Sequence, residues 1–197
     1  MKNWRLFSLI AGLSLFPACS YRWQPEYPYG IRPTVSVPFV VGDEDGMLTA
    51  AIIRALSSSG LVDVRSSGGD YQLQVTITSG TSENIGYRID PQKVDGKVRK
   101  NLLACEGRRT MSIQASLCQG EELIYGPYPI TCDAEYDYVD GDSIQDLTFV
   151  NPAGKVVTVL PFSLGQLESV ESAQEASSKP LYNRLAQKIV DAISLEW

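Results

Sequence analysis

The chain has 197 residues, with 17 Lys and Arg, 23 Asp and Glu and no His, which gives a formal net charge of −6 at pH 7. A net-acidic chain argues against nucleic acid as a partner, because contacts with phosphate need a basic surface. The absence of histidine excludes Ser-His-Asp and Cys-His catalysis and removes the commonest zinc ligand. We find neither a G-x-S-x-G elbow nor a glycine-rich phosphate loop, so we predict a protein that is not an enzyme and needs no cofactor.

The N-terminus has the form of a bacterial lipoprotein signal. A positively charged start precedes an apolar run over residues 6–16, which is too short to span a membrane because a span needs roughly 20 residues. Ala18 then precedes Cys19, where such a signal would be cut and the cysteine acylated. We therefore expect residues 1–18 to be removed and Cys19 to carry a lipid. The alternative is a plain signal peptide or an uncleaved anchor.

Residues 19–33 are expected to form an extended tether between the lipid and the rest of the chain. Three prolines in this segment disfavour helix. Its tyrosines and tryptophan either lie at a membrane interface or pack on the domain, and the sequence does not choose between the two. The remaining residues, 34–197, are enough for one domain with a core of its own.

The first half of that domain reads as a strand, a helix and a second strand. Residues 34–41 are β-branched and apolar, which predicts a buried strand. Apolar side chains recur at helical spacing over residues 47–56. The acidic residues of the segment 43–46, which reads D-E-D-G just before this helix, are expected to satisfy its free N–H groups rather than to bind calcium. Apolar and polar residues alternate over 71–78, which predicts a strand of a sheet with one wet face.

The second half repeats this alternation and ends in a helix. Apolar and polar residues alternate over 109–118, and a second segment, 122–132, follows a turn at Gly120, which predicts a hairpin. An apolar stripe over residues 181–193 predicts a final helix. Residues 133–165 give no clear pattern. We predict an α/β fold of the α+β two-layer sandwich type: a mixed sheet of about four strands with two helices packed on one face.

Three further cysteines, Cys105, Cys118 and Cys132, allow one disulfide with one thiol left over. If Gly120 is the centre of the hairpin turn, Cys132 faces approximately residue 108, which is close to Cys105. We therefore favour a disulfide between Cys105 and Cys132. The alternative is three reduced thiols, most of them buried.

Four short motifs occur in an order that is typical of one family. Residues 19–22 read C-S-Y-R, and residues 34–39 read T-V-S-V-P-F with a VP-x-F element. Residues 70–77 form a D-x-x-L-x-V-x-I strand, and residues 184–193 form an R-L-A-x-x-I-V-x-x-I helix. In this order the motifs resemble the lipopolysaccharide-assembly lipoprotein (LptE-type) family, from which the chain departs in carrying Ser20 where glycine is usual.

The resemblance implies a single LptE-like domain over residues 34–197, with enlarged segments at 85–105 and 133–165. It implies a non-enzymatic lipoprotein, anchored on the periplasmic side of the outer membrane by the lipid on Cys19. Its partners would be lipopolysaccharide and a large outer-membrane β-barrel of the lipopolysaccharide transport system, which it would plug and help to assemble. Two alternatives stay open: a stand-alone envelope lipoprotein that binds a lipid or a cell-wall fragment, and an accessory subunit of a secretion or transport complex.

One stretch of this acidic chain is strongly basic. Residues 93–109 contain six basic residues and two acidic ones, Asp95 and Glu106, which gives a local charge of +4. Arg and Lys on a loop are the expected partners of the phosphates of lipopolysaccharide. The candidate residues are Lys93, Lys97, Arg99, Lys100, Arg108 and Arg109. The alternative is a solvated loop whose charges bind nothing.

Overall fold

The computed structural model describes residues 32–94, 96–141, 143, 147–158 and 169–194, all in a compact unit that begins at Arg32. The expected signal over residues 1–18, the lipidation of Cys19 and most of the expected tether lie outside the described residues. None of the helices in this part of the chain is long and apolar enough to cross a membrane.

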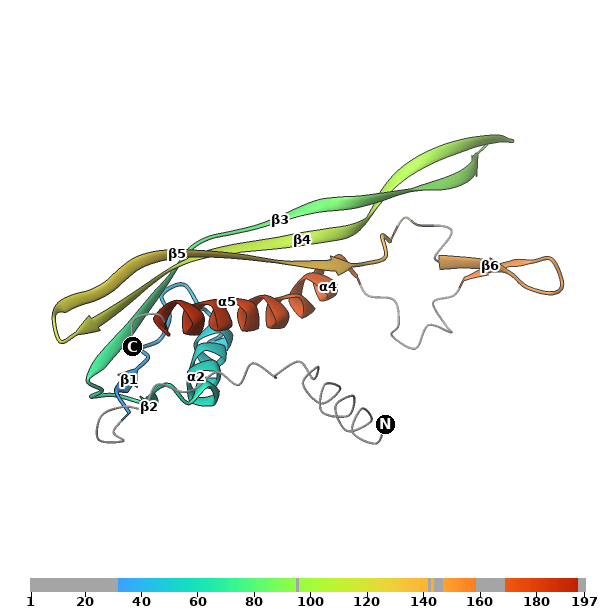
Figure 1. The fold of residues 1–197 in the computed structure, drawn as a ribbon. Coiled ribbons are helices and arrows are strands. Elements are labelled where there is room, and N and C mark those ends of the chain that lie inside the picture. The colour runs from blue at the N-terminus through green and yellow to red at the C-terminus, as the bar shows by residue number, and fades with distance from the viewer. Residues whose placement is uncertain (1–31, 95, 142, 144–146, 159–168, 195–197) are drawn as a thin grey trace, which may run out of the picture. The chain divides into compact units, whose positions relative to one another are not determined.

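In the described residues, five strands form one sheet in the order β2-β1-β3-β4-β5, and two short strands form a separate hairpin (Figure 1). The strands of the sheet are β1 (Thr34–Ser36), β2 (Asp63–Arg65), β3 (Tyr71–Val94), β4 (Lys97–Gln119) and β5 (Glu122–Asp137). The separate hairpin consists of β6 (Thr148–Val150) and β7 (Val156–Thr158). The helices are α2 (Met47–Ser59), α4 (Val170–Ala176) and α5 (Ser178–Ile193). The predicted α+β fold with a mixed sheet is confirmed, with five strands in the sheet rather than about four because the short β2 joins its edge.

The sheet combines parallel and antiparallel pairs. β1 is parallel to both of its neighbours, whereas β3, β4 and β5 are antiparallel. Parallel strands need a long crossover connection, and α2 supplies it between β1 and β2. Side-chain bonds fix the start of β1 against the start of β3: the N–H and the hydroxyl of Thr34 donate to Oδ2 of Asp70 over 3.1 and 2.7 Å. The N–H of Asp70 donates in return to Oγ1 of Thr34 over 2.8 Å.

The core lies between one face of the sheet and the two longer helices, α2 and α5. Its apolar side chains come from alternate positions of the strands and from one stripe of each helix, as burial of one sheet face and one helix face requires. The most deeply buried of them are Leu48, Ile52 and Leu56 of α2, Leu73 and Ile113 of the sheet, and Leu181, Leu185 and Ile189 of α5. The opposite face carries exposed polar side chains such as Gln74, Thr76 and Gln114. The expected arrangement of two helices on one face is therefore confirmed.

A buried carboxylate begins α2. Oδ2 of Asp43 accepts the N–H of Thr49 over 2.7 Å and its hydroxyl over 2.6 Å, and Oδ1 accepts the N–H of Leu48 over 3.3 Å. The Thr49 oxygen in turn accepts the N–H of Val40 over 3.1 Å, which ties the helix to the chain that follows β1. Burial raises the pKa of Asp43, but the bonds from Thr49 and Leu48 outweigh it and hold the pKa below its ordinary value. The expectation that this acidic segment satisfies helix N–H groups is confirmed.

The largest difference from the sequence pattern is the length of the β3–β4 hairpin. The two strands pair from Gln72 with Cys118 as far as Val94 with Lys97, interrupted by bulges near Ile77 and Gly86. Strands in globular proteins usually have 3–10 residues. The segment over residues 85–105, which looked enlarged, is thus the outer half of one continuous hairpin.

Candidate functional site

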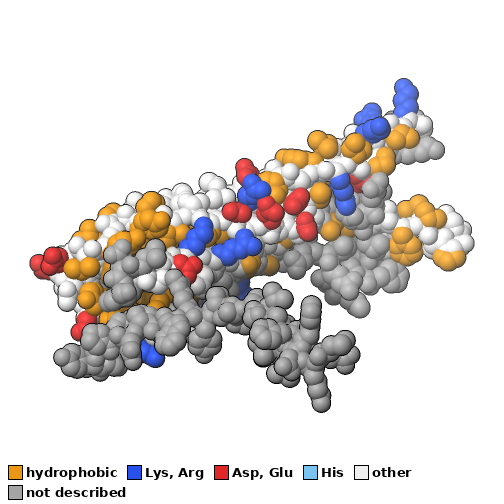
Figure 2. Space-filling view, viewed as in Figure 1, with side chains coloured by type: hydrophobic (Ala, Val, Ile, Leu, Met, Phe, Trp, Pro, Cys, Tyr) orange, Lys and Arg blue, Asp and Glu red, His pale blue; other side chains and the backbone are white. Residues whose placement is uncertain are grey.

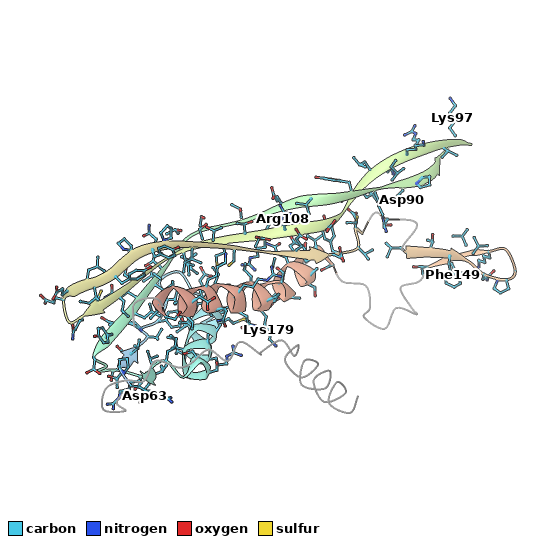
Figure 3. All side chains as sticks on the ribbon, in the orientation of Figure 1. Asp63, Asp90, Lys97, Arg108, Phe149 and Lys179 are labelled. Atoms are coloured by element: carbon cyan, nitrogen blue, oxygen red, sulfur yellow. The ribbon has the colours of Figure 1, made fainter. Side chains whose placement is uncertain are left out.

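The candidate basic residues lie on the β3–β4 hairpin, but in three separate places. Lys97, Arg99 and Lys100 are exposed at its tip, where Figure 3 labels Lys97 and Figure 2 shows basic side chains gathered. Lys93 lies across from them on β3, opposite Val98 in the register. The tip therefore collects four of the six candidates.

Arg108 lies away from the tip. It is eight residues beyond Lys100 on the same strand, which corresponds to about 26 Å at a rise of about 3.3 Å per residue. Its guanidinium donates to Oε1 of Glu135, directly across the ladder on β5, from Nη2 over 2.6 Å and from Nε over 3.2 Å. Nη1 lies 3.8 Å from a carboxylate oxygen of Glu83. These partners, above all the hydrogen bond to Glu135, raise the pKa of Arg108. The guanidinium is thus paired with carboxylates of the sheet.

Arg109 points to the opposite face from its neighbour, because successive side chains of a strand alternate. Its Nη1 donates to the hydroxyl of Ser178, the first residue of α5. Ser178 is buried, and the Arg109 side chain is half-buried. Arg109 therefore fixes the start of α5 on the sheet and does not belong with the tip.

Exposed apolar side chains, which were not among the candidate residues predicted from the sequence, accompany the tip cations. Val98 and Leu102 are 66% and 67% exposed, and Ile89 and Tyr87 are also more than half exposed. The register pairs Ile89 with Leu102, and the alternation places Val98, Lys100 and Leu102 on one face of the hairpin and Lys97 and Arg99, at its end, on the other. We call this set of exposed residues the tip surface: Lys97, Arg99, Lys100, Tyr87, Ile89, Val98 and Leu102. The signal that could have revealed it was the spacing of Val98 and Leu102, which places two apolar residues on the same side of a strand as Lys100.

Behind the tip, the other face of the outer hairpin is covered. The hydroxyl of Tyr138 donates to Oδ1 of Asn84 over 2.9 Å, and Nη2 of Arg88 donates to the hydroxyl of Ser143 over 2.7 Å. Asp90 is fully buried on this side, and burial raises the pKa of Tyr138. The chain that follows β5 thus packs against one face of the hairpin, whereas Ile89 and Leu102 on the other face are exposed among the described residues.

The register corrects the expected disulfide. Cys132 pairs with Met111, which is six residues along β4 from Cys105, or about 20 Å at about 3.3 Å per residue. A disulfide needs Cα atoms within about 7 Å. Two irregularities, between Ala115 and Leu117 and between Leu117 and Cys118, shift the strands relative to a simple hairpin centred on the turn. In the structure Cys105, Cys118 and Cys132 are free thiols, so the prediction of a bond between Cys105 and Cys132 is wrong.

A family model described as "LptE: Lipopolysaccharide-assembly" matches residues 33–193. The chain belongs to the LptE family. The resemblance seen in the short motifs is thereby confirmed, and a role in lipopolysaccharide assembly follows from membership of the LptE family. No curated protein sequence matches the chain significantly.

Several solved structures are similar to this LptE family member over most of its length. A minor lipoprotein from Acinetobacter baumannii is 14% identical, with a TM-score of 0.42, over 84% of this chain and 93% of that one. The rare lipoprotein B from Shewanella oneidensis is also 14% identical, with a TM-score of 0.42, over 83% and 95% of the two chains. A lipoprotein B from Nitrosomonas europaea is 11% identical, with a TM-score of 0.41, over 83% and 85%. These likenesses are loose, and the family assignment rests on the match over residues 33–193.

Proposed function

We propose that this LptE family member is a non-enzymatic lipoprotein, anchored by a lipid on Cys19 to the periplasmic side of the outer membrane. There it assists the assembly and operation of a large lipopolysaccharide-exporting β-barrel and is seated in it as a plug. One observation carries the proposal beyond the family role: the sheet buries one face under α2 and α5 and leaves the other polar. A polar sheet face suits contact with the water-filled lumen of a barrel.

The proposal includes contact between the tip surface and lipopolysaccharide. Lys97, Arg99 and Lys100 would meet its phosphates, because charge-assisted hydrogen bonds to phosphate are the strong ones. The exposed side chains of Val98 and Leu102 would lie beside its acyl chains, since they lose water-exposed apolar area in doing so. Arg108 and Arg109, which the sequence grouped with the tip, have partners within the fold and are left out of this contact.

Association with a barrel is tested by affinity purification of the tagged full-length chain from native membranes in mild detergent, followed by mass spectrometry. A near-stoichiometric large β-barrel is the expected companion. A Cys19→Ala variant is the matched control for anchoring, and it should leave the membrane fraction. A clean preparation without a barrel, from membranes that contain the candidate, would overturn the plug proposal and favour a stand-alone lipid-binding lipoprotein.

Contact with lipopolysaccharide is tested by neutralising Lys97, Arg99 and Lys100 together to alanine. If each exposed ion pair contributes about 0.5 kcal/mol, the affinity for lipopolysaccharide micelles falls about tenfold. The matched control removes the same charge elsewhere, by replacing the exposed Arg54, Arg65 and Lys179 with alanine. Both variants should melt at the temperature of the unmodified protein. Equal micelle affinity of the two variants would remove the tip from the proposal.

A further inference from the structure

β5 is an outer strand of the sheet. Two hydrogen bonds from side chains show which of its backbone carbonyls point away from the sheet. Nζ of Lys188 donates to the carbonyl of Thr131 over 2.8 Å, and Nη1 of Arg184 donates to the carbonyl of Asp133 over 2.8 Å. Both donors lie on α5, so these carbonyls point away from β4. In a strand the N–H and C=O of one residue point to the same side. Residues 131 and 133 therefore turn both backbone groups outward, and no described strand pairs with them.

A hollow runs along the seam between this edge and α5. One part of about 370 Å³ lies between Cys132–Asp133 and the helix, and an adjoining part of about 370 Å³ lies between Tyr128–Thr131 and the helix. Lys188 lines both parts, so the two adjoin at its side chain. In Figure 1, β5 runs along the length of α5 at the near edge of the sheet.

We propose that this seam, the β5–α5 groove, binds an extended acidic segment of a partner protein as an added sheet strand. An open strand edge is a template for pairing, and peptides that add to such an edge place alternate side chains in the adjacent groove. The partner's N–H groups would replace the side chains of Lys188 and Arg184 on the outward carbonyls. The groove is distinct from the tip surface, and the proposal does not rest on contact with lipopolysaccharide.

The charges around the groove specify the chemistry of the added strand. Once displaced, the ammonium of Lys188 and the guanidinium of Arg184 face the partner side chains that point toward α5, and they favour carboxylates there. Asp191 lines one end of the groove and accepts a bond from the Gln187 amide over 3.1 Å, so α5 contributes two cations and one carboxylate to the lining.

The opposite face of the added strand meets different side chains. Thr131 and Asp133 are exposed on the wet face of β5, as is Glu135, which already pairs with Arg108. Cross-strand pairs of like charge are unfavourable. The added strand therefore alternates acidic residues toward α5 with hydroxyl residues toward the wet face.

The edge also sets where pairing begins. Pro129 occupies the outward position before Thr131 and has no N–H to donate, which ends pairing on that side. The outward N–H groups available for an added strand are thus those from Thr131 onward.

The probes are two labelled peptides, Ac-(Glu-Thr)4-NH2 and Ac-(Lys-Thr)4-NH2, titrated with the full-length protein and followed by fluorescence anisotropy. We expect the acidic peptide to bind at least about tenfold more tightly than the basic one. Binding should slow the amide hydrogen exchange of Thr131 and Asp133. No binding of the acidic peptide, or equal binding of the two, would overturn the proposal.

Two variants separate strand addition from general charge attraction. Thr131→Pro removes one outward N–H, because proline has none, as at Pro129 on the same strand. It should lower the affinity for the acidic peptide at least about fivefold. Thr131→Ser keeps the N–H and should bind like the unmodified protein. Arg184→Glu with Lys188→Glu keeps the edge and should reverse the preference toward the basic peptide. Undiminished acidic-peptide binding by the double variant, or by Thr131→Pro with an unchanged melting temperature, would refute strand addition in the groove.

Discussion

Replacement of Asp43 by alanine should destabilise the protein strongly although the residue is far from the tip surface. The carboxylate accepts the N–H groups of Leu48 and Thr49 and the hydroxyl of Thr49, and it is only 3% exposed. Loss of an N-terminal helix cap costs about 1 kcal/mol. Leaving buried donors of Thr49 without an acceptor costs about 1–3 kcal/mol more. We expect the free energy of unfolding to fall by about 2–4 kcal/mol at pH 7.

Urea denaturation followed by circular dichroism measures this loss, and Asp45→Ala is the matched control. Asp45 also accepts a helix N–H, that of Met47 over 2.9 Å, but it is exposed. Its loss should therefore stay below about 1 kcal/mol, since water can replace the carboxylate. If Asp43→Ala and Asp45→Ala were equally stable, the assignment of the buried cap would be refuted.

The pH dependence gives a second measurement on the same residue. The folded pKa of Asp43 lies below its ordinary value, so its stabilising contribution is complete above the unfolded pKa of about 3.9 and is lost as the pH falls through the folded pKa. The stability difference between the unmodified protein and Asp43→Asn, which cannot ionise, should therefore shrink as the pH falls below about 4. A difference that is constant from pH 7 to pH 3 would contradict the lowered pKa.

Three further predictions concern residues that the sequence assigned to other roles. Arg109→Met should lower the free energy of unfolding by about 1–2 kcal/mol and leave micelle binding unchanged, because the Arg109 bond to Ser178 is structural. A double-mutant cycle on the exposed pair Arg108 and Glu135 should give only a small coupling, which shrinks further in 1 M salt. A reducing agent should leave the melting temperature unchanged, and alkylation after denaturation without reduction should label Cys105 and Cys132.

The sequence predicted the elements that have one buried face, because burial is what creates a readable period. Leu73, Val75 and Ile113 alternate with polar residues, and they face the helices in the structure. Beyond Thr78 the helices no longer cover the hairpin, so fewer of its side chains are buried and its apolar and polar residues no longer alternate clearly. The full length of β3 and β4 could therefore not be predicted from the sequence. The joining of β2 to the edge rests on only three residues, which give too short a pattern.

The candidate site was predicted only in part, because neighbours in sequence are not neighbours in space. Period two sends Arg108 and Arg109 to opposite faces, and the rise along the strand separates both from Lys100. Partners such as Glu135 and Ser178 come from other elements, and sequence spacing does not show them. The same limit affected Cys132, since two irregularities near Leu117 moved its register.

The outer half of the β3–β4 hairpin has a consequence for local unfolding. Two-stranded hairpins are marginal on their own, and among the described residues this one is supported on the covered face with Asp90. Amide protons near residue 100 should therefore exchange at much lower opening free energies than those near Ile113, where both helices hold the sheet. We therefore expect the segment that carries the tip surface to open separately from the core and at lower free energy. A bound molecule can reorder it at small cost while the core stays closed.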